Sequence, residues 1–276
     1  MAKITAAEVN ALRKSTGAGM MDCKNALVEA EGDSEKAIKI LRKKGQKIAD
    51  KRADRDAAEG VIIAKVSDDK KFGAVLRISC ETDFVAKNEE FVNFVVGIVD
   101  YAIENKIANV EDLKVAKMGE LTISELVLEQ LGKIGEKIEI VDYQTISDEM
   151  VFAYIHTGNR LATIMGVNKA DVDDIDIIGK EINMQIAAMA PIALDKDGID
   201  AETVKKEIEI GMDQARREGK PEAMLEKIAM GKLGKFYKEN TLLAQKFVRD
   251  NKISVEQYLK NADKDLTVTK FYRLAL

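Results

Sequence analysis

Apolar positions recur every three or four residues in the first 46 residues, which predicts three short amphipathic helices. Thr5 and Glu8 have the spacing of a capping box that opens the first helix, the second spans about residues 21–31, and Asp33 caps the third. The positions expected to face inward are Val9, Leu12, Ala37, Ile38 and Leu41. A core of this size is marginal by itself, so we expect residues 1–46 to form a small domain with apolar surface left for a partner.

The next stretch loses this pattern. Residues 47–59 are dense in Lys, Arg, Asp and Ala, with no aliphatic period after Ile48. We therefore expect the third helix to end before Gly45 and residues 47–59 to form a solvated linker, either helical or flexible.

Residues 60–137 have the pattern of a first α+β unit. The runs 61–66 and 72–80 are rich in β-branched residues and are separated by a short polar stretch, which predicts a β-hairpin. An apolar helix is expected to begin at Asn88, and a second helical pattern covers residues 121–131.

The same order recurs farther along the chain. Residues 150–156 and 161–167 predict a second hairpin, and residues 175–190 predict a second apolar helix. The strand pattern is expected to resume at Ile138, and the tail 266–273 is expected to join the second sheet. We therefore assign residues 138–199 and 236–276 to a second half of the core, related to the first by duplication.

A charged insertion, residues 200–235, interrupts the second half. Helical patterns over 201–218 and 222–235 flank Gly219-Lys220-Pro221, which predicts an antiparallel helical hairpin of the coiled-coil kind. The positions expected to meet across it are Val204, Ile208, Met212, Leu225, Ile228 and Ala229. Two roles are equally consistent with this hairpin: a scaffold for a homodimer, or an arm that contacts a partner. The predicted fold class of the whole chain is α+β.

Composition and charge exclude several classes of function. Charged residues make up 33% of the 276-residue chain, hydrophobic residues 46%, and the net charge is -5, so the protein as a whole does not attract nucleic acid. The basic run that begins at Arg42 is diluted by Asp50, Asp54 and Asp56, which is typical of a solvated face. No apolar run reaches the roughly 18 residues of a membrane span, so we expect a cytoplasmic protein.

The sequence offers little for catalysis. Cys23, Cys80 and the single histidine, His156, do not have the spacing of a metal site, and we expect neither a metal nor a cofactor. Phosphate-binding loops, dinucleotide-binding glycine motifs and nucleophile elbows are missing from the sequence, so we expect no substrate chemistry and no direct nucleotide binding. A Cys/His nucleophile pair would have to use His156 without a local signature.

Residues 80–87, Cys-Glu-Thr-Asp-Phe-Val-Ala-Lys, place an acid beside a large aromatic between a predicted strand and a predicted helix. By itself the pattern permits an ordinary structural interpretation, with Phe84 as a core anchor and Asp83 as a helix-start acid. The alternative is a projecting wedge, in which Phe84 is exposed to enter a partner's pocket.

Thr82-Asp83-Phe84-Val85 resembles the signature of the elongation factor Ts family, the guanine-nucleotide exchange factors of elongation factor Tu. Residues 16–24, Thr-Gly-Ala-Gly-Met-Met-Asp-Cys-Lys, are similar to that family's N-terminal motif and lie at the expected distance upstream. The resemblance covers nearly the whole chain. It implies that residues 1–46 form a ubiquitin-associated-like domain and that the protein promotes GDP release from elongation factor Tu.

The resemblance also implies roles for individual residues. Thr82, Asp83, Phe84 and Val85 would disturb the magnesium and phosphate site of elongation factor Tu, with Thr82 and Val85 holding the loop's shape. Leu12, Met20 and Met21 would contact the partner's GTPase domain, and methionine suits such a surface. His156 would make a further partner contact, although a lone histidine at a strand end is more often structural or merely exposed.

Two other functions are consistent with parts of the sequence. A ubiquitin-associated-like adaptor that tethers partners without exchange activity accounts for residues 1–46 but leaves Thr82-Asp83-Phe84-Val85 unexplained. An enzyme that uses a Cys/His pair is the third alternative.

Overall fold

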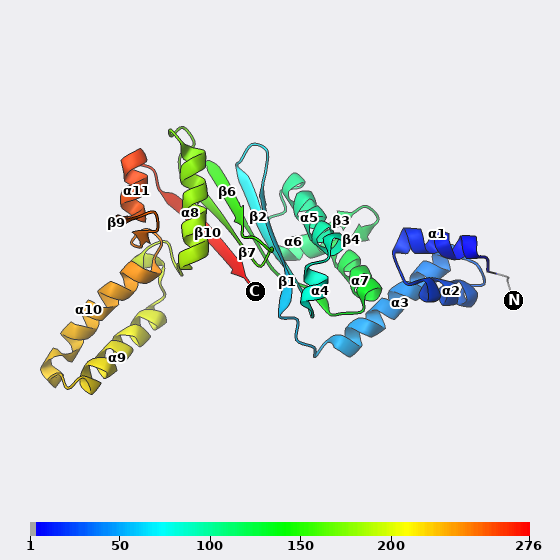
Figure 1. Cartoon of the computed structure of the whole chain (residues 1–276), viewed down its shortest axis with the longest axis horizontal. Helices are drawn as coiled ribbons and strands as arrows, with labels where there is room; N and C mark the ends of the chain where they lie inside the picture. The colour runs from blue at the N-terminus through cyan, green and yellow to red at the C-terminus, as the bar shows by residue number, and fades with distance from the viewer. Residues whose placement is uncertain (1–3) are drawn as a thin grey trace.

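The computed structural model describes residues 4–276 as an elongated molecule with three parts in series (Figure 1). Three helices lie at one end, a body built on two three-stranded sheets occupies the middle, and a helical hairpin extends from the other end. Among the described residues, no helix combines the length and the apolar character needed to cross a bilayer.

The N-terminal helices are α1 (Ala6–Thr16), α2 (Met20–Glu29) and α3 (Ser34–Arg52). The predicted capping box is present, since Thr5 and Glu8 hydrogen-bond each other's backbone N–H groups, and Asp33 caps α3. The core of this domain contains Val9, Leu12, Cys23, Ala26, Leu27, Ala30 and Ala37.

The predicted end of the third helix before Gly45 is wrong, because α3 continues through Gly45 to Arg52. Gly45 is buried against α7 (Ile123–Ile134), where a Cβ atom would lie 3.3 Å from the carbonyl oxygen of Leu128. This packing offsets the low helix propensity of glycine. Only residues 53–58 of the predicted linker lack helix or strand structure.

The first sheet has the strand order β1 (Glu59–Val66), β2 (Phe72–Cys80) and β5 (Ile138–Ser147), all antiparallel. The predicted hairpin is therefore correct. Placing the strand after Ile138 in the second half is wrong, because β5 pairs with β2. The predicted boundary at residue 138 followed the order of the elements in the sequence. A strand instead joins the sheet edge that its register and apolar face fit.

Helices α4 (Asp83–Ala86) and α5 (Glu89–Glu104) follow β2 directly, with Asn88 as the N-cap of α5, as predicted. The chain then forms a short stretch of small elements before α7: α6 (Val110–Val115), β3 (Lys117–Met118) and β4 (Leu121–Thr122).

The second sheet has the order β10 (Val268–Ala275), β7 (Leu161–Val167) and β6 (Met150–Ile155). The C-terminal strand re-enters this sheet beside β7, as predicted, and α8 (Ile175–Met189) packs on the sheet. Elements that the sequence pattern did not indicate complete this half: a 3-10 turn (Lys196–Gly198), β8 (Lys246–Phe247), β9 (Asp250–Ser254) and α11 (Val255–Ala262).

Strand β1 is buried on both faces, which explains its continuous apolar run. Val61 and Ile63 face the core that contains α5, whereas Ile62 and Ala64 face a core shared with the second sheet. The second sheet contributes Val151, Ala162 and Ile164 to that shared core. Alternate side chains of one strand thus join the two halves into one body.

The predicted hairpin consists of α9 (Ala201–Arg217) and α10 (Glu222–Asn240). Its closest approach differs from the predicted aliphatic contact, because Gly211 lies against Ala229, where a Cβ atom would be 3.1 Å away. The fully buried positions are Gly211, Ala215, Leu225, Ala229 and Leu233, whereas Val204, Ile208 and Met212 are half-buried. Small residues at the crossing let the two helices approach closely.

Candidate functional site

The most exposed large apolar side chain described is Phe84, on the single-turn helix α4. Its side chain is 83% exposed, which rules out the alternative in which it anchors the core. Its neighbour Val85 is half-buried and packs on the first core. The short helix thus turns adjacent side chains in opposite directions, and Asp83 and Phe84 form a projecting tip.

The tip carries a negative charge beside the aromatic ring. Asp83 forms an ion pair with Lys87 one turn later, at 2.6 Å. The hydrogen bond and the charge of Lys87 lower the pKa of Asp83 below its usual value, so this carboxylate is ionised at neutral pH.

The base of the tip is held by residues distant in sequence. Thr82 donates to the Glu136 carboxylate from both its backbone N–H, at 3.1 Å, and its hydroxyl, at 2.8 Å. Glu81 accepts from Arg52 Nη1, at 2.7 Å, and from the backbone N–H of Lys137. Nothing in the local sequence pattern links Arg52 or Glu136 to this motif, because only the tertiary fold brings them to it.

The turn after β6 lies near the same end of the two sheets. His156 is exposed there, and its Nδ1 lies 2.9 Å from the hydroxyl of Tyr154. Arg160 in this turn pairs with Glu59 at the start of β1. The hydrogen bond to Glu59, and then the charge of Glu59, raise the pKa of Arg160, and the charge of Asp83 adds a smaller contribution in the same direction. Sequence reasoning did not identify Arg160.

The methionines of the N-terminal motif lie on a different part of the molecule. Met20 and Met21 begin α2 and are 52% and 62% exposed, as a docking surface requires. Leu12 is only 3% exposed and belongs to the domain core. The expected direct contact of Leu12 is therefore corrected to a supporting role, because its side chain is used in packing α1 against α2.

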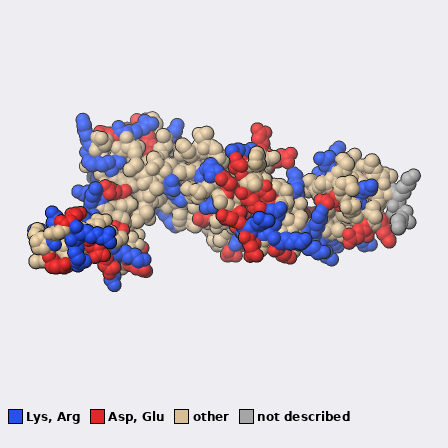
Figure 2. Space-filling view, turned by 60° about the horizontal axis from the view of Figure 1, so that its bottom comes forward, with Lys and Arg blue, Asp and Glu red and all other residues tan. Residues whose placement is uncertain are grey.

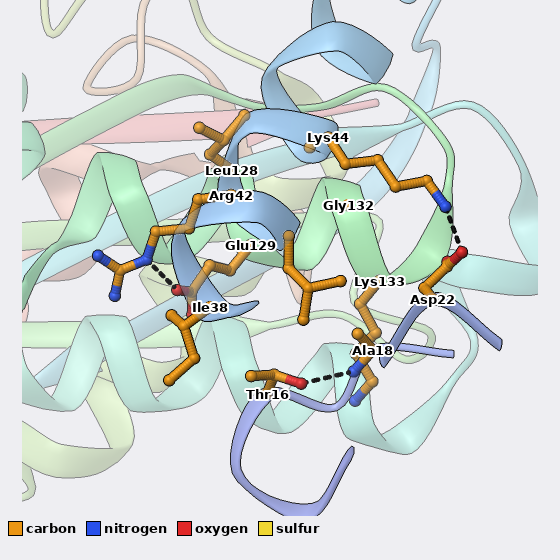
Figure 3. Close-up of a pocket in the computed structure, with 12 residues that line it drawn as sticks. Thr16, Ala18, Asp22, Ile38, Arg42, Lys44, Leu128, Glu129, Gly132 and Lys133 are labelled. Atoms are coloured by element: carbon orange, nitrogen blue, oxygen red, sulfur yellow. Dashed lines mark hydrogen bonds and ion pairs between the residues drawn. The ribbon is translucent and has the colours of Figure 1, made fainter. Parts of the chain in front are cut away.

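A close crossing of α3 and α7 holds the N-terminal helices, and with them the exposed Met20 and Met21 (the methionine face), against the first half of the core. Gly45 of α3 and Gly132 of α7 meet with a separation that leaves almost no room for a Cβ atom. Ion pairs Arg42–Glu129 and Lys44–Asp22 flank the crossing (Figure 3). The cavity between them measures about 40 Å³, far below the roughly 300 Å³ of a small-molecule site. The crossing of α3 and α7 is thus a structural contact, and its cavity has no room for a nucleotide.

On the face of the described residues that Figure 2 shows, positive charge does not gather into a separate patch. Lysines and arginines lie intermixed with aspartates and glutamates over the face in Figure 2. The basic positions of α3 take part in this mixture, since Arg42, Lys44 and Arg52 each pair with an acid.

The thiols do not provide a nucleophile. Cys23 and Cys80 are both buried, and burial, followed by the charge of Glu136, raises the pKa of Cys80 to about 12. A thiol with such a pKa is almost entirely protonated at neutral pH. Among residues 4–276, no three His, Cys, Asp or Glu side chains gather in the manner of a metal site.

We expect neither thiol of the folded protein to react with iodoacetamide at about pH 8, because both are buried and the thiolate of Cys80 is suppressed. Both should react once the protein is unfolded in urea. Mass spectrometry of the intact chain reads the number of adducts. Rapid modification of Cys80 in the native state would contradict this account of its surroundings.

Comparison with known proteins places these features in a family. The family model described as elongation factor TS matches residues 81–276, a range that begins at the base of the tip. Elongation factor Ts of Christiangramia forsetii is 52% identical over 276 residues, covering 100% of both chains. The corresponding proteins of Amoebophilus asiaticus and Flavobacterium psychrophilum are 50% and 49% identical and cover 98% and 100% of both chains. The chain therefore belongs to the elongation factor Ts family.

Proposed function

We propose that this protein is a guanine-nucleotide exchange factor that binds elongation factor Tu in its GDP-bound form and accelerates GDP release. The observation that carries the proposal is the tip, where an exposed Phe84 stands beside an ionised Asp83 in a chain of the elongation factor Ts family. An apolar ring held away from its own core suits insertion into a partner's cleft. The adjacent carboxylate suits disturbance of the partner's magnesium and phosphate site.

Exchange is a coupling free energy between the exchange factor and the nucleotide. Whatever factor weakens GDP binding in the presence of this protein must weaken binding of this protein in the presence of GDP. The complex with nucleotide is therefore transient, and the nucleotide-free complex is the tight one. The protein itself is proposed to bind no nucleotide and to act in the cytoplasm.

The free energies involved require that docking and distortion of the partner be carried out by different parts of the protein. A roughly thousandfold acceleration of release corresponds to about 4 kcal/mol of barrier reduction. Burial of one Phe side chain supplies only about 1.5–3 kcal/mol, so Phe84 cannot both dock the protein and distort the partner. We therefore assign docking to the methionine face and the second half of the core, including the exposed His156, and distortion to the tip.

The adaptor alternative predicts binding without acceleration. It accounts for the methionine face but gives no role to an exposed Phe84. The structure offers no observation that favours it over exchange.

Stopped-flow release of a fluorescent GDP analogue from elongation factor Tu tests the proposal, with this protein titrated in and unlabelled GDP in excess. We expect acceleration that rises with concentration and saturates. A cognate, active partner that binds this protein without any acceleration would reject exchange and support the adaptor.

A double substitution, Met20→Ser with Met21→Ser, should raise the half-saturating concentration in this titration by about tenfold or more, because two exposed apolar side chains would leave the docking surface. The maximal release rate should stay within about twofold, since the tip is unchanged. Val115→Ser, which changes an exposed apolar residue of α6 away from the methionines, is the matched control. Loss of maximal rate with unchanged half-saturation would assign the methionines to the distortion step instead.

A further inference from the structure

The tip is a very short element with little of its own to fix it. Helix α4 has four residues, none of them fully buried, and an isolated single turn is unstable in water. Its backbone hydrogen bonds run from Ala86 to Thr82 and from Lys87 to Asp83, at 3.2 and 3.0 Å. The direction in which Phe84 points must therefore be fixed by contacts outside the helix.

One such contact is made by Glu136, in the turn between α7 and β5. Its two carboxylate oxygens accept separately from the N–H and the hydroxyl of Thr82. A hydroxyl has one proton to donate, so this bond also orients the Thr82 oxygen to accept from the N–H of Val85. Glu136 thus holds Thr82, the N-cap of α4, through both its backbone N–H and its hydroxyl.

The second contact is made by Arg52, the last residue of α3. Its Nη1 lies 2.7 and 2.8 Å from the two carboxylate oxygens of Glu81, the residue that precedes Thr82. The Glu81 side chain is only 16% exposed and also accepts from Lys137 N–H at 2.6 Å. Burial tends to raise the pKa of Glu81, but the Lys137 and Arg52 contacts outweigh burial and lower it. The pair is therefore charged at neutral pH.

We propose that Arg52, Glu81 and Glu136 are positioning residues that hold the tip in the direction required for exchange, so that α3 links the docked N-terminal domain to the tip. This inference rests on the proposed function. Residues 20 and 21 and residue 52 lie on consecutive helices of one domain, and α3 is itself held against α7 at Gly45. Docking through Met20 and Met21 therefore holds α3 in place. The last residue of α3, Arg52, in turn pairs with Glu81 at the base of the tip.

The alternative is that these contacts only stabilise the fold. In that case, removing them would lower the overall stability and leave the tip as ordered as the rest of the core. Positioning instead predicts a local loosening of residues 82–87, because each of these contacts ends at Glu81 or Thr82.

Hydrogen exchange on the free protein separates the two roles and needs no partner. The variants are Glu136→Gln, which keeps the shape but loses the charge, and Arg52→Met. Lys65→Met, which breaks the Lys65–Asp100 ion pair of the same core half, is the matched control. We expect the amides of Val85, Ala86 and Lys87 to exchange about tenfold faster in both tip variants, as for loss of one charge-assisted hydrogen bond, and to be unchanged in the control. Unchanged exchange at these amides would overturn the proposal.

Nucleotide release then measures the consequence. With the same variants, the maximal rate of GDP release should fall about tenfold while the half-saturating concentration changes by less than about threefold. Arg52→Lys, which keeps the charge but not the planar group, should fall between Arg52→Met and the natural protein. A tip that loosens without any loss of maximal rate would overturn the positioning role.

Hydrogen exchange and GDP release test two different statements, the role of these residues in holding the tip and the exchange activity itself. If the unaltered protein does not accelerate release, the proposed function is rejected, together with the role of these residues in exchange. The hydrogen-exchange result still decides whether they hold the tip.

Discussion

Phe84→Ala should lower the maximal rate of GDP release from elongation factor Tu by about ten- to a hundredfold, the kinetic equivalent of losing about 1.5–3 kcal/mol of buried Phe side chain. Affinity for nucleotide-free elongation factor Tu should change by only a few fold, because docking is assigned to other surfaces. The free energy of unfolding should stay within about 0.5 kcal/mol, since the ring is 83% exposed and supports no core.

Stopped-flow titration gives the rate, and calorimetric titration against nucleotide-free elongation factor Tu gives the affinity. Val115→Ala, on α6 in the same half of the core, removes an exposed apolar side chain from a surface with no assigned role and serves as the control. Equal losses in release rate and in affinity would contradict the assignment of distortion to the tip and of docking to other surfaces.

The second large effect is expected from Gly132→Val, at the crossing of α3 and α7. A Cβ atom on Gly132 would lie 3.2 Å from the Cα atom of Gly45, so backbone, with no flexible side-chain end, would have to move. Such overpacking costs about 1–3 kcal/mol, and the helices are expected to separate to relieve it. The methionine face would then lose its fixed position relative to the tip.

We expect the half-saturating concentration for GDP release to rise about tenfold or more in this variant, with a smaller change in the maximal rate. Urea unfolding measures the stability, and small-angle X-ray scattering measures whether the N-terminal domain has moved. Gly231→Val is the matched control, because a Cβ atom at that α10 position meets nothing within 4 Å. Normal titration by a Gly132→Val protein whose scattering has changed would show that the fixed orientation is not needed.

Local signals in the sequence predicted most individual elements. The capping box at Thr5 and Glu8, the hairpin at residues 61–80, the apolar helix after Asn88 and the helical hairpin all follow from periodicity and end signals that act within a few residues. The motif around Asp83 and Phe84 could be found from its resemblance to the family signature, since its residues are consecutive.

Long-range packing decided the rest. Whether Gly45 ends a helix depends on α7, and whether Ile138 begins a strand of the first or the second sheet depends on the edge that β2 leaves open. Leu12 shared a sequence pattern with the exposed methionines, but only the packing of α1 and α2 showed that it is buried.

For the candidate site, too, local sequence signals and long-range packing supplied different parts of the result. By itself the sequence pointed to the residues of the tip and of the methionine face through their resemblance to two family motifs, and capping and apolar spacing predicted the helices beside them, because both kinds of signal lie in neighbouring residues. Only the tertiary structure decided that Phe84 is exposed, that Arg160 pairs with Glu59, and that Arg52 and Glu136 hold the base of the tip. The physical reason is that charge pairs and hydrogen bonds between distant segments form only after the cores have packed, and nothing in the local pattern of either partner records the other.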